Sequence, residues 1–440
     1  MTEMIPLTMA QYTIVTGILS SSDVKNINRV NTLTLCFEWE KGSEELLQKI
    51  GNWLLEYNDA FRLIPMYKFP WKWKQYIKPY QKEIFPVLYF EDETQYETWL
   101  KKEKNNDIRL LKDPLYDFRI LVRPDGGYTL WIQMHHFITD GYSLKLIANQ
   151  VRALNLYFTK GTPLLVPYPN SYIEYVKKEK EYRKSQQYKD DRAYWKDVFR
   201  YRKDYSFPAG SRSMKVDSDS QFITIDKPLY HKLLTFCKEN KLSVSSVLNS
   251  TAATVVYALK GATYFSMATL SYGRHDGKTR HTMGCMMTSP VIMYDIEEEK
   301  SFTDFCRKNY VENIEMLRHV RYSNIDFTPL SYVLCTLHGM NYNHSWMLLS
   351  HMDYESAFIN GEPRGRMFWS DSNISQFYAA IFDLPKEENV KIELRYQTNR
   401  FAHDEITKLL LASVNILKAA LNEPDKSLEE LFKAKVEEKI

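Results

Sequence analysis

The sequence predicts an α/β protein with two lobes, and three observations lead to this fold class. The chain has 440 residues, more than one small core can hold, and 44% of them are apolar. Strand-like and helix-like patterns alternate in both halves of the chain. Between the halves, residues 174–203 are strongly charged, and Pro208 and Gly210 follow as a break.

The first half shows a helix, a β-hairpin and a second helix. Residues 44–55 place apolar side chains at helical spacing: Leu46, Leu47, Ile50, Leu54 and Leu55. Residues 118–122 and 128–134 are expected to be two strands, and the turn between them carries glycines, which tolerate positive φ. Helical spacing then returns at Leu144, Ile147, Ala148, Val151 and Leu154. The segment between strand and helix is therefore a loop held by two rigid elements, where catalytic groups usually lie.

The middle and the second half of the chain continue the α/β pattern. The charged residues 174–203 predict one long exposed helix that leads into a connector. Beyond the connector we expect strands at 221–225, 264–270 and 393–396, and helices at 229–239, 244–259 and 405–421. These patterns assign residues 1–170 to the first lobe, 171–215 to an inter-lobe helix and connector, and 216–440 to the second lobe.

The composition argues against several classes of protein. The net charge is +3, from 58 basic and 55 acidic residues, so the sequence shows no electrostatic footprint for nucleic acid. The five cysteines form no CxxC pair, which favours a reducing compartment over disulfides or zinc; they are Cys36, Cys237, Cys285, Cys306 and Cys335. No signal-peptide pattern and no run of about 18 apolar residues is present. We therefore expect a soluble, cytoplasmic protein that does not enter a membrane.

The segment WIQMHHFITDGYS, residues 131–143, carries the most chemistry. Neutral imidazole accepts a proton near pH 7 and imidazolium returns it, so a histidine at the end of a strand suits acid–base work in a cleft. Because successive strand residues face opposite sides, one of His135 and His136 should point away from any site. Asp140 can brace the loop, and Gly141 permits a close approach of substrate or backbone.

Simpler roles are open for the same residues. His135 can be a packing residue, Asp140 can cap the helix that begins near Tyr142, and Gly141 can serve only the turn. The two histidines lack the spacing of a helical zinc site and have no third ligand nearby, so we expect no metal. The pattern HHxxxDG as a whole is much more specific than its parts, and its place between a strand and a helix supports a functional site.

With these residues the sequence resembles the active-site motif of nonribosomal peptide synthetase condensation domains, within the chloramphenicol acetyltransferase-like superfamily. The resemblance spans nearly the whole chain. Further segments are similar to family motifs: 8–11 to S-x-A-Q, 58–62 to R-H-E-x-L-R, 194–195 to an aromatic pair, 271–274 to S-G-R, 284–289 to G-x-F-V-N-T, and 394–401 to a late strand motif. Asn58 and Asp59 replace the His-Glu pair of the family's second motif.

The resemblance implies two acetyltransferase-like lobes in a V-shaped pseudo-dimer with a central tunnel. A donor carrier protein would bring an acyl or aminoacyl thioester on its phosphopantetheine arm, and an amine acceptor, carrier-bound or free, would meet it at His136. Asp140 would pair with Arg274 and brace the loop, Gly141 would leave room for the donor arm, and Arg62 would be structural. The implied activity is amide formation in nonribosomal peptide biosynthesis, by a monomer without a bound cofactor of its own.

Two other functions stay open. The superfamily also contains coenzyme A-dependent acyltransferases that act on hydroxyls or free amines, and HHxxxDG does not separate the two. A non-catalytic docking module is the third possibility. The altered positions 58–59 and 288–289 keep it open, whereas an intact active-site set argues against it: His136, Asp140, Gly141 and Arg274.

Two further expectations concern the second lobe and the extent of the chain. His351 and Asp353 lie in a segment similar to one that lines the tunnel, and we expect them to pack rather than to catalyse. The chain is expected to be a free-standing condensation enzyme, with an excised domain as the alternative.

Overall fold

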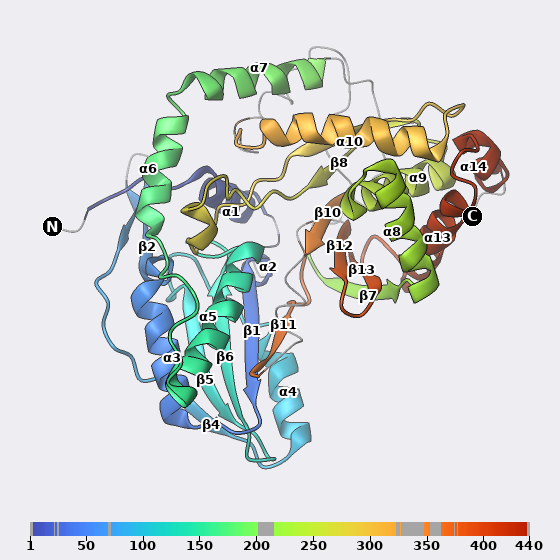
Figure 1. Cartoon of the computed structure of the whole chain (residues 1–440). Helices are drawn as coiled ribbons and strands as arrows, with labels where there is room; N and C mark the ends of the chain where they lie inside the picture. The colour runs from blue at the N-terminus through green and yellow to red at the C-terminus, as the bar shows by residue number, and fades with distance from the viewer. Residues whose placement is uncertain are drawn as a thin grey trace.

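The structure is a computed structural model that describes residues 3–21, 23, 26–68, 72–200, 215–322, 326, 347–352, 362–373, 375 and 377–437. Four residues considered above lie outside these ranges: Pro208, Gly210, Cys335 and Asp353. Within the described residues the chain forms two α/β lobes, as the sequence predicts (Figure 1).

The first lobe is built on a sheet with strand order β11-β1-β6-β5-β4. Its strands are β1 (Thr32–Trp39), β4 (Val87–Tyr89), β5 (Tyr116–Val122), β6 (Tyr128–His135) and β11 (Arg364–Phe368), with a separate hairpin of β2 (Leu63–Lys68) and β3 (Lys72–Ile77). Its helices are α1 (Met9–Ser20), α2 (Ile27–Val30), α3 (Glu44–Tyr57), α4 (Glu93–Glu103) and α5 (Gly141–Lys160), with a 3₁₀ turn, η1 (Asp59–Arg62). The predicted helix at 44–55, hairpin at 118–134 and helix through Leu154 are confirmed.

Both faces of this sheet are covered by helices, so β6 is buried from its second residue to its last. Leu130 and Ile132 point into the large core with side chains of α3 and α5. Trp131, between them, points into a smaller cluster with Tyr96 and Leu100 of α4. Successive strand residues face opposite sides, so the side chains on both faces of β6 are buried, with Thr129 and Gln133 as polar members.

The prediction of a single exposed helix over 174–203 is wrong, because one helix ends at Tyr182 and a second helix begins at Gln186. The chain forms α6 (Tyr172–Tyr182) and α7 (Gln186–Arg200), which runs across the end of α6 in Figure 1. The hydroxyl of Ser185 accepts a hydrogen bond from the Tyr188 amide at 3.2 Å, as a residue that starts a new helix does. Nor is α6 fully exposed, since Tyr172, Val176 and Tyr182 are buried along one side of it.

The second lobe is built on a sheet with strand order β7-β13-β12-β10-β8-β9. Its strands are β7 (Ser218–Thr224), β8 (Tyr264–Thr269), β9 (Val291–Asp295), β10 (Met347–Met352), β12 (Phe377–Leu384) and β13 (Asn389–Gln397). Its helices are α8 (Lys227–Asn240), α9 (Val244–Lys260), α10 (Phe302–Arg318), α13 (His403–Asn422) and α14 (Leu428–Glu437), with a 3₁₀ turn, η2 (Thr279–His281). All three strands and all three helices predicted for this half are present.

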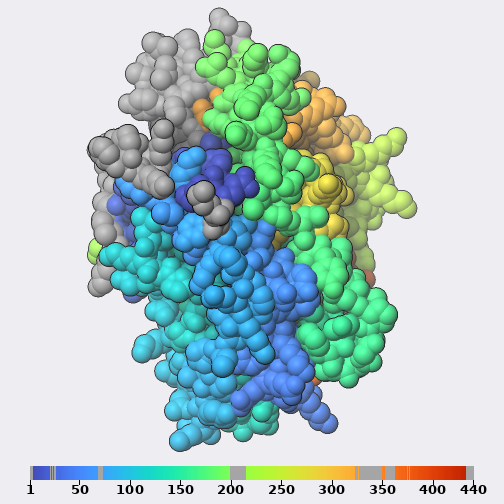
Figure 2. Space-filling view, turned by 90° about the vertical axis from the view of Figure 1, so that its left-hand side faces the viewer, coloured from blue at the N-terminus to red at the C-terminus, as the bar shows by residue number. Residues whose placement is uncertain are grey.

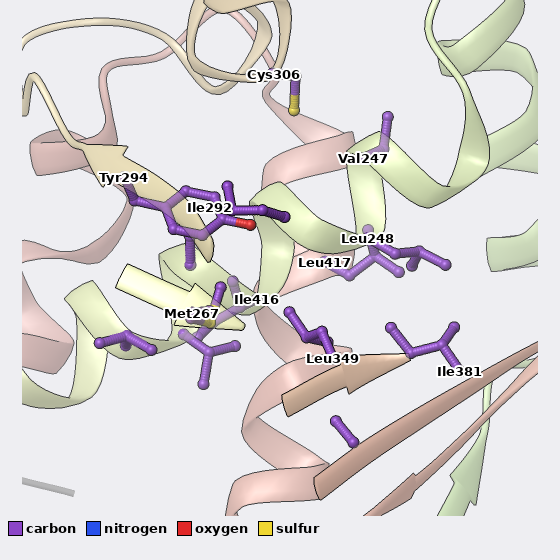
Figure 3. Close-up of a cluster of buried hydrophobic side chains, with 14 of the residues drawn as sticks. Val247, Leu248, Met267, Ile292, Tyr294, Cys306, Leu349, Ile381, Ile416 and Leu417 are labelled. Carbon is purple, nitrogen blue, oxygen red and sulfur yellow. The ribbon is translucent and has the colours of Figure 1, made fainter. Parts of the chain in front are cut away.

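The core of the second lobe lies between its helices and one face of its sheet. Figure 3 shows Leu349 of β10 and Ile381 of β12 on the strands, facing Leu248 of α9 and Leu417 of α13. Of the described helices, none is by itself long and apolar enough to cross a membrane. The pair α8 and α9 meets the length and composition limits only together, across a 108° bend.

Residues of the second half also complete the first lobe. Along β12, Ala379 and Ile381 belong to the second-lobe core, whereas Tyr378, Ala380 and Phe382 belong to the first-lobe core. Strand β11 lies antiparallel beside β1 and extends the first sheet. The two lobes therefore share packing surfaces, and the loop that follows β8 runs along the same junction.

Candidate active site

The histidine motif lies where β6 ends and α5 begins. His135 is the last residue of the strand, opposite Thr32 of β1. Its side chain is buried, and its Nδ1 accepts a hydrogen bond from the Phe137 amide at 2.9 Å. Burial, helped by the neighbouring His136, lowers the pKa of His135 to about 3. A neutral imidazole used as a backbone acceptor inside the core fits the structural role expected for His135.

His136, the residue after the strand, is only partly buried as a whole residue. Its amide donates to the Asn31 carbonyl at 2.6 Å, which fixes the backbone next to the first strand. Its Nδ1 is shielded from solvent. Burial lowers the pKa of His136, and backbone hydrogen bonding at His136 and Thr139 and the charge of Asp140 raise it in part. His136 is therefore neutral near pH 7, the state in which imidazole accepts a proton.

The Asp140 carboxylate combines two jobs that the sequence leaves as alternatives. It caps α5, accepting hydrogen bonds from the Ser143 amide at 2.9 Å and from the Ser143 hydroxyl at 2.8 Å. Its other oxygen accepts from Arg274 and, at 2.9 Å, from the Met286 amide. The side chain is fully buried. One carboxylate thus holds both the start of α5 and the loop that follows β8.

Arg274 supplies the positive half of this anchor. Beyond Asp140, its guanidinium donates to the carbonyl oxygens of Tyr272 at 2.7 Å and Gly284 at 3.1 Å. It also donates to the Ser143 hydroxyl at 3.0 Å and lies over the Tyr142 ring at 4.8 Å. The pairing of Asp140 with Arg274 that the family resemblance implies is present. Because its donors are spread over the loop and α5, Arg274 holds the loop in place rather than facing a ligand.

Gly141 and Arg62 lie apart in the fold. Gly141 is the first residue of α5, next to the capping Asp140. Arg62 ends η1 and donates to the backbone carbonyls of Lys78 at 3.3 Å and Glu56 at 3.1 Å. These contacts hold the segment between α3 and β3 and do not reach the histidine motif. They suit the structural role expected for Arg62.

Three supporting residues were missed by the sequence reasoning. Asn31 orients the backbone of His136, and nothing in the sequence marks it. Ser143 could have been found as the third residue after a capping aspartate. Tyr172 of α6 donates to the Cys285 carbonyl at 2.7 Å and lies 3.1 Å from the Thr8 hydroxyl, so it joins α1, α6 and the loop; its partners are far away in sequence.

The altered Asn58–Asp59 positions have structural partners of their own. Asp59 accepts hydrogen bonds from the hydroxyl of Ser171 and, at 2.9 Å, from the amide of Tyr172, at the start of α6. Asn58 donates to the Gln150 side chain at 3.0 Å. In the second lobe, burial lowers the pKa of His351 to about 4, and its Nε2 lies 2.7 Å from Asn249, as in a packed core residue. Its predicted companion Asp353 is outside the described residues.

Comparison with known families matches residues 1–439 to the Condensation domain. Among curated proteins, the chain is similar to surfactin synthase subunit 1 and to a plipastatin synthase subunit, both of Bacillus subtilis (strain 168). It is 23% identical to each, over 76% and 92% of its own length. It spans only 9% and 16% of the length of these two relatives.

Solved structures give the same fold. The first condensation domain of the calcium-dependent antibiotic synthetase is 15% identical, with a TM-score of 0.81 over 97% of this chain and 98% of that one. A variant of the starter condensation domain of rhizomide synthetase, solved in complex with C8-CoA, is 16% identical, with a TM-score of 0.80 over 97% and 96%. A family match over nearly the whole length, with the HHxxxDG loop anchored at the junction of two lobes, identifies this chain as a member of the condensation domain family.

Proposed function

We propose that this protein joins a carrier-tethered acyl or aminoacyl thioester to an amine and so forms an amide in nonribosomal peptide-type biosynthesis. The observation that carries the proposal is His136, a neutral and only partly buried histidine on a loop fixed by the buried Asp140–Arg274 pair. A donor carrier protein would present the thioester on its phosphopantetheine arm, and the amine would come free or on a second carrier. We expect the protein to act as a monomer in the cytoplasm.

In the proposed reaction the amine nitrogen attacks the thioester carbonyl carbon. A C–N bond forms, the C–S bond breaks, and the thiolate leaves. The proton of the attacking amine passes to Nε2 of His136 and from there to the thiolate. Holding the two reactants together supplies effective molarities of about 10⁵ M or more, and a positioned base adds roughly 10²- to 10⁴-fold. His136 therefore orients the amine and takes its proton late in the step.

The remaining motif residues would support this step without touching the reacting atoms. Asp140 and Arg274 hold the loop, His135 packs beneath it, and Gly141 leaves room for the donor arm. Arg62 stabilises the segment that leads to the first hairpin. We keep the division of the chain at 1–170, 171–215 and 216–440 as part of the same proposal.

A coenzyme A-dependent acyltransferase is the second candidate function. One observation favours it: a related starter condensation domain was solved in complex with C8-CoA. The same His136 would then serve a hydroxyl or amine acceptor, with the coenzyme A thiolate as the leaving group. Carrier and coenzyme A donors share the phosphopantetheine thioester, so the site itself does not separate them.

The test compares donors directly. One acyl group is offered as a carrier-protein thioester and as a coenzyme A thioester, with a panel of amines and alcohols, and mass spectrometry reads the products. His136→Ala is the active-site variant. His231→Ala is the matched control, since His231 is an exposed histidine on α8 whose side chain is 57% exposed.

Each outcome decides between the candidates. Amide product from the carrier donor, formed about 10- to 100-fold more slowly by His136→Ala and at the wild-type rate by His231→Ala, supports the proposal. Product mainly from coenzyme A moves the protein to the acyltransferase function. Absence of product from either donor, across several acyl groups, contradicts both and favours the docking module.

A further inference from the structure

A cavity lies beside the loop anchor, between α1, α6 and the loop that follows β8. Its volume is about 220 Å³. Figure 2 views this side of the molecule, with the dark blue residues of α1 against the green residues of α6 and the yellow loop beyond. Pockets for drug-sized ligands run from roughly 300 Å³ upward, so this cavity suits a smaller molecule. Its wall includes Met9, Tyr175, Glu179, Tyr182, Met286 and Arg321.

The Glu179 carboxylate in this wall forms no ion pair with a described residue, although the nearby charge of Arg183 acts on it. It accepts hydrogen bonds from the Met9 amide at 2.8 Å and from the Tyr175 hydroxyl at 3.3 Å, and both are neutral donors. Arg183, one turn further along α6, is held by both carboxylate oxygens of Asp326. Burial raises the pKa of Glu179 to about 7. A buried carboxylate that faces a cavity without forming an ion pair is suited to a cationic ligand.

Arg321 supplies the opposite charge. Its guanidinium lies over the Tyr182 ring at 4.1 Å, and among the described residues it has no hydrogen bond or ion pair. A guanidinium held against a ring keeps its five N–H donors for a carboxylate, which it binds in a two-pronged geometry. Lys178 and Asp276, which also line the cavity, form an ion pair with each other, with 2.6 Å between Nζ and Oδ2.

We propose that this cavity binds a small zwitterionic amino acid, with its ammonium group on Glu179 and its carboxylate on Arg321. Glu179 and Arg321 line the same cavity and form no ion pair with each other. A ligand that carries both an ammonium group and a carboxylate would neutralise the two side chains at once. The apolar parts of the wall, Ala10 and Met286, lie against the side chain of such a ligand. This binding does not depend on the proposed function.

The cavity is connected to the active-site loop through its wall. Met286 lines the cavity, and its amide donates to Asp140 at 2.9 Å. Gly273, the residue before Arg274, also lines it and packs so closely on the Met286 carbonyl that a Cβ there would lie 2.0 Å from the oxygen. An amino acid in the cavity therefore rests on the loop that Asp140 and Arg274 hold.

The experiment measures binding by isothermal titration calorimetry on the full chain, without a donor. The probes are glycine, alanine, valine and phenylalanine as zwitterions, methylamine as the ammonium alone, acetate as the carboxylate alone, and inorganic phosphate. Glu179→Gln and Arg321→Ala are the test variants. Glu174→Gln on α6 and Arg318→Ala on α10 are the matched controls, since both are exposed residues in local pairs, at 3.2 Å and 2.6 Å.

We expect at least one small amino acid to bind, and methylamine, acetate and phosphate to bind more weakly. Each test variant should weaken binding by about 10- to 100-fold, as the loss of one charge-assisted hydrogen bond does, and the controls should not. Glu179→Gln keeps an oxygen for the Met9 amide, and its NH₂ group can donate to the Tyr175 hydroxyl, so a thermal melt should show it folded. Absence of amino-acid binding, equal binding by the test variants, or equal affinity for phosphate overturns the proposal.

The two proposals fail in different ways. If amino acids bind through Glu179 and Arg321 but no donor gives product, the proposed function falls and the binding site stands. If amide is formed but no amino acid binds, or the two test variants bind it as tightly as the wild type, the function stands and the binding site falls. The His136→Ala variant should turn over more slowly and keep the amino-acid affinity, because His136 does not line the cavity.

Discussion

Asp140 and Arg274 are 134 positions apart in sequence and form an ion pair that is sealed from solvent, with side chains 0% and 2% exposed. Asp140 lies at the start of α5 in the first lobe, and Arg274 lies on the loop that follows β8 of the second. A buried pair of this kind adds little net stability, but removing one partner leaves a charge without compensation. The pair therefore fixes the geometry of the motif loop and makes it sensitive to either substitution.

Replacing Asp140 should destabilise the protein through two separate losses, the counter-charge of Arg274 and the cap of α5. Asp140→Asn keeps an oxygen for the Ser143 amide but leaves Arg274 without its counter-charge, so we expect a loss of roughly 3–5 kcal/mol in the free energy of unfolding. Asp140→Ala also removes the helix cap and should lose about 1 kcal/mol more. Chemical denaturation followed by fluorescence measures both losses.

The control for this comparison is Asp92, the exposed cap of α4, which accepts from the Gln95 amide at 2.8 Å. Asp92→Asn should be nearly neutral, and Asp92→Ala should show the capping loss alone, about 1 kcal/mol. An Asp140→Asn variant as stable as the wild type would contradict the sealed ion pair.

Acid should destabilise the protein through His135. The folded pKa of His135 is about 3, below the ordinary 6.5, so as the pH falls below 6.5 the unfolded chain takes up a proton that the folded protein refuses. This part of the stability is present above pH 6.5 and is lost as the pH falls towards 3. The variant His135→Asn removes the titration and keeps a side-chain acceptor for the Phe137 amide.

The measurement is the free energy of unfolding at several pH values from 7 down to about 4.5, where one such group contributes at most about 1.4 kcal/mol per pH unit. The wild type should lose more stability than His135→Asn over this range, because the carboxylates titrate alike in both. Parallel curves for the two proteins would mean that His135 titrates normally in the folded state.

The sequence predicts those parts of the fold that are set by local patterns. The hairpin before the motif and helix α5 follow from alternation and helical spacing, and the loop between them is therefore predictable. The break between α6 and α7 was not predicted, because charged residues are typical of an exposed helix and Ser185 alone is a weak signal for a helix boundary. Strand β11 was not predicted, because its pairing with β1 joins residues more than 300 positions apart and no local pattern indicates such a partner.

In the candidate site, too, some residues can be predicted from local patterns and others cannot. His136 and Asp140 stand out as residue types at a known spacing, and Ser143 follows from the cap. The partner of Asp140 came from the family resemblance rather than from any local pattern, since Arg274 is one of many arginines. The contacts of Asn31, Tyr172 and Met286 depend on how the two lobes meet, so they require the folded structure.

Gly284 should be intolerant of any side chain. Its φ is +150°, and a Cβ at this position would lie 2.2 Å from the ring of Tyr172. We expect Gly284→Ala to lower the free energy of unfolding by roughly 1–3 kcal/mol, as overpacking in a core does. Gly277→Ala, where nothing lies within 4 Å of the added Cβ, is the control on the same loop and should change stability by no more than about 0.5 kcal/mol. Equal melting temperatures for both variants would contradict the close approach.

His136→Ala should separate amide from ester formation. An α-amine has a pKa near 8 and is partly neutral at about pH 7, so positioning alone retains part of its reactivity. A hydroxyl titrates far above neutrality and depends on a base to remove its proton, so the variant should lose the full 10²- to 10⁴-fold for an alcohol and only about 10- to 100-fold for an amine. The measurement is turnover with two acceptors that differ only in NH₂ against OH, with His231→Ala as control. A His136→Ala variant that keeps full activity with either acceptor removes His136 from the mechanism, whereas equal losses for both would make it a base in amide formation as well.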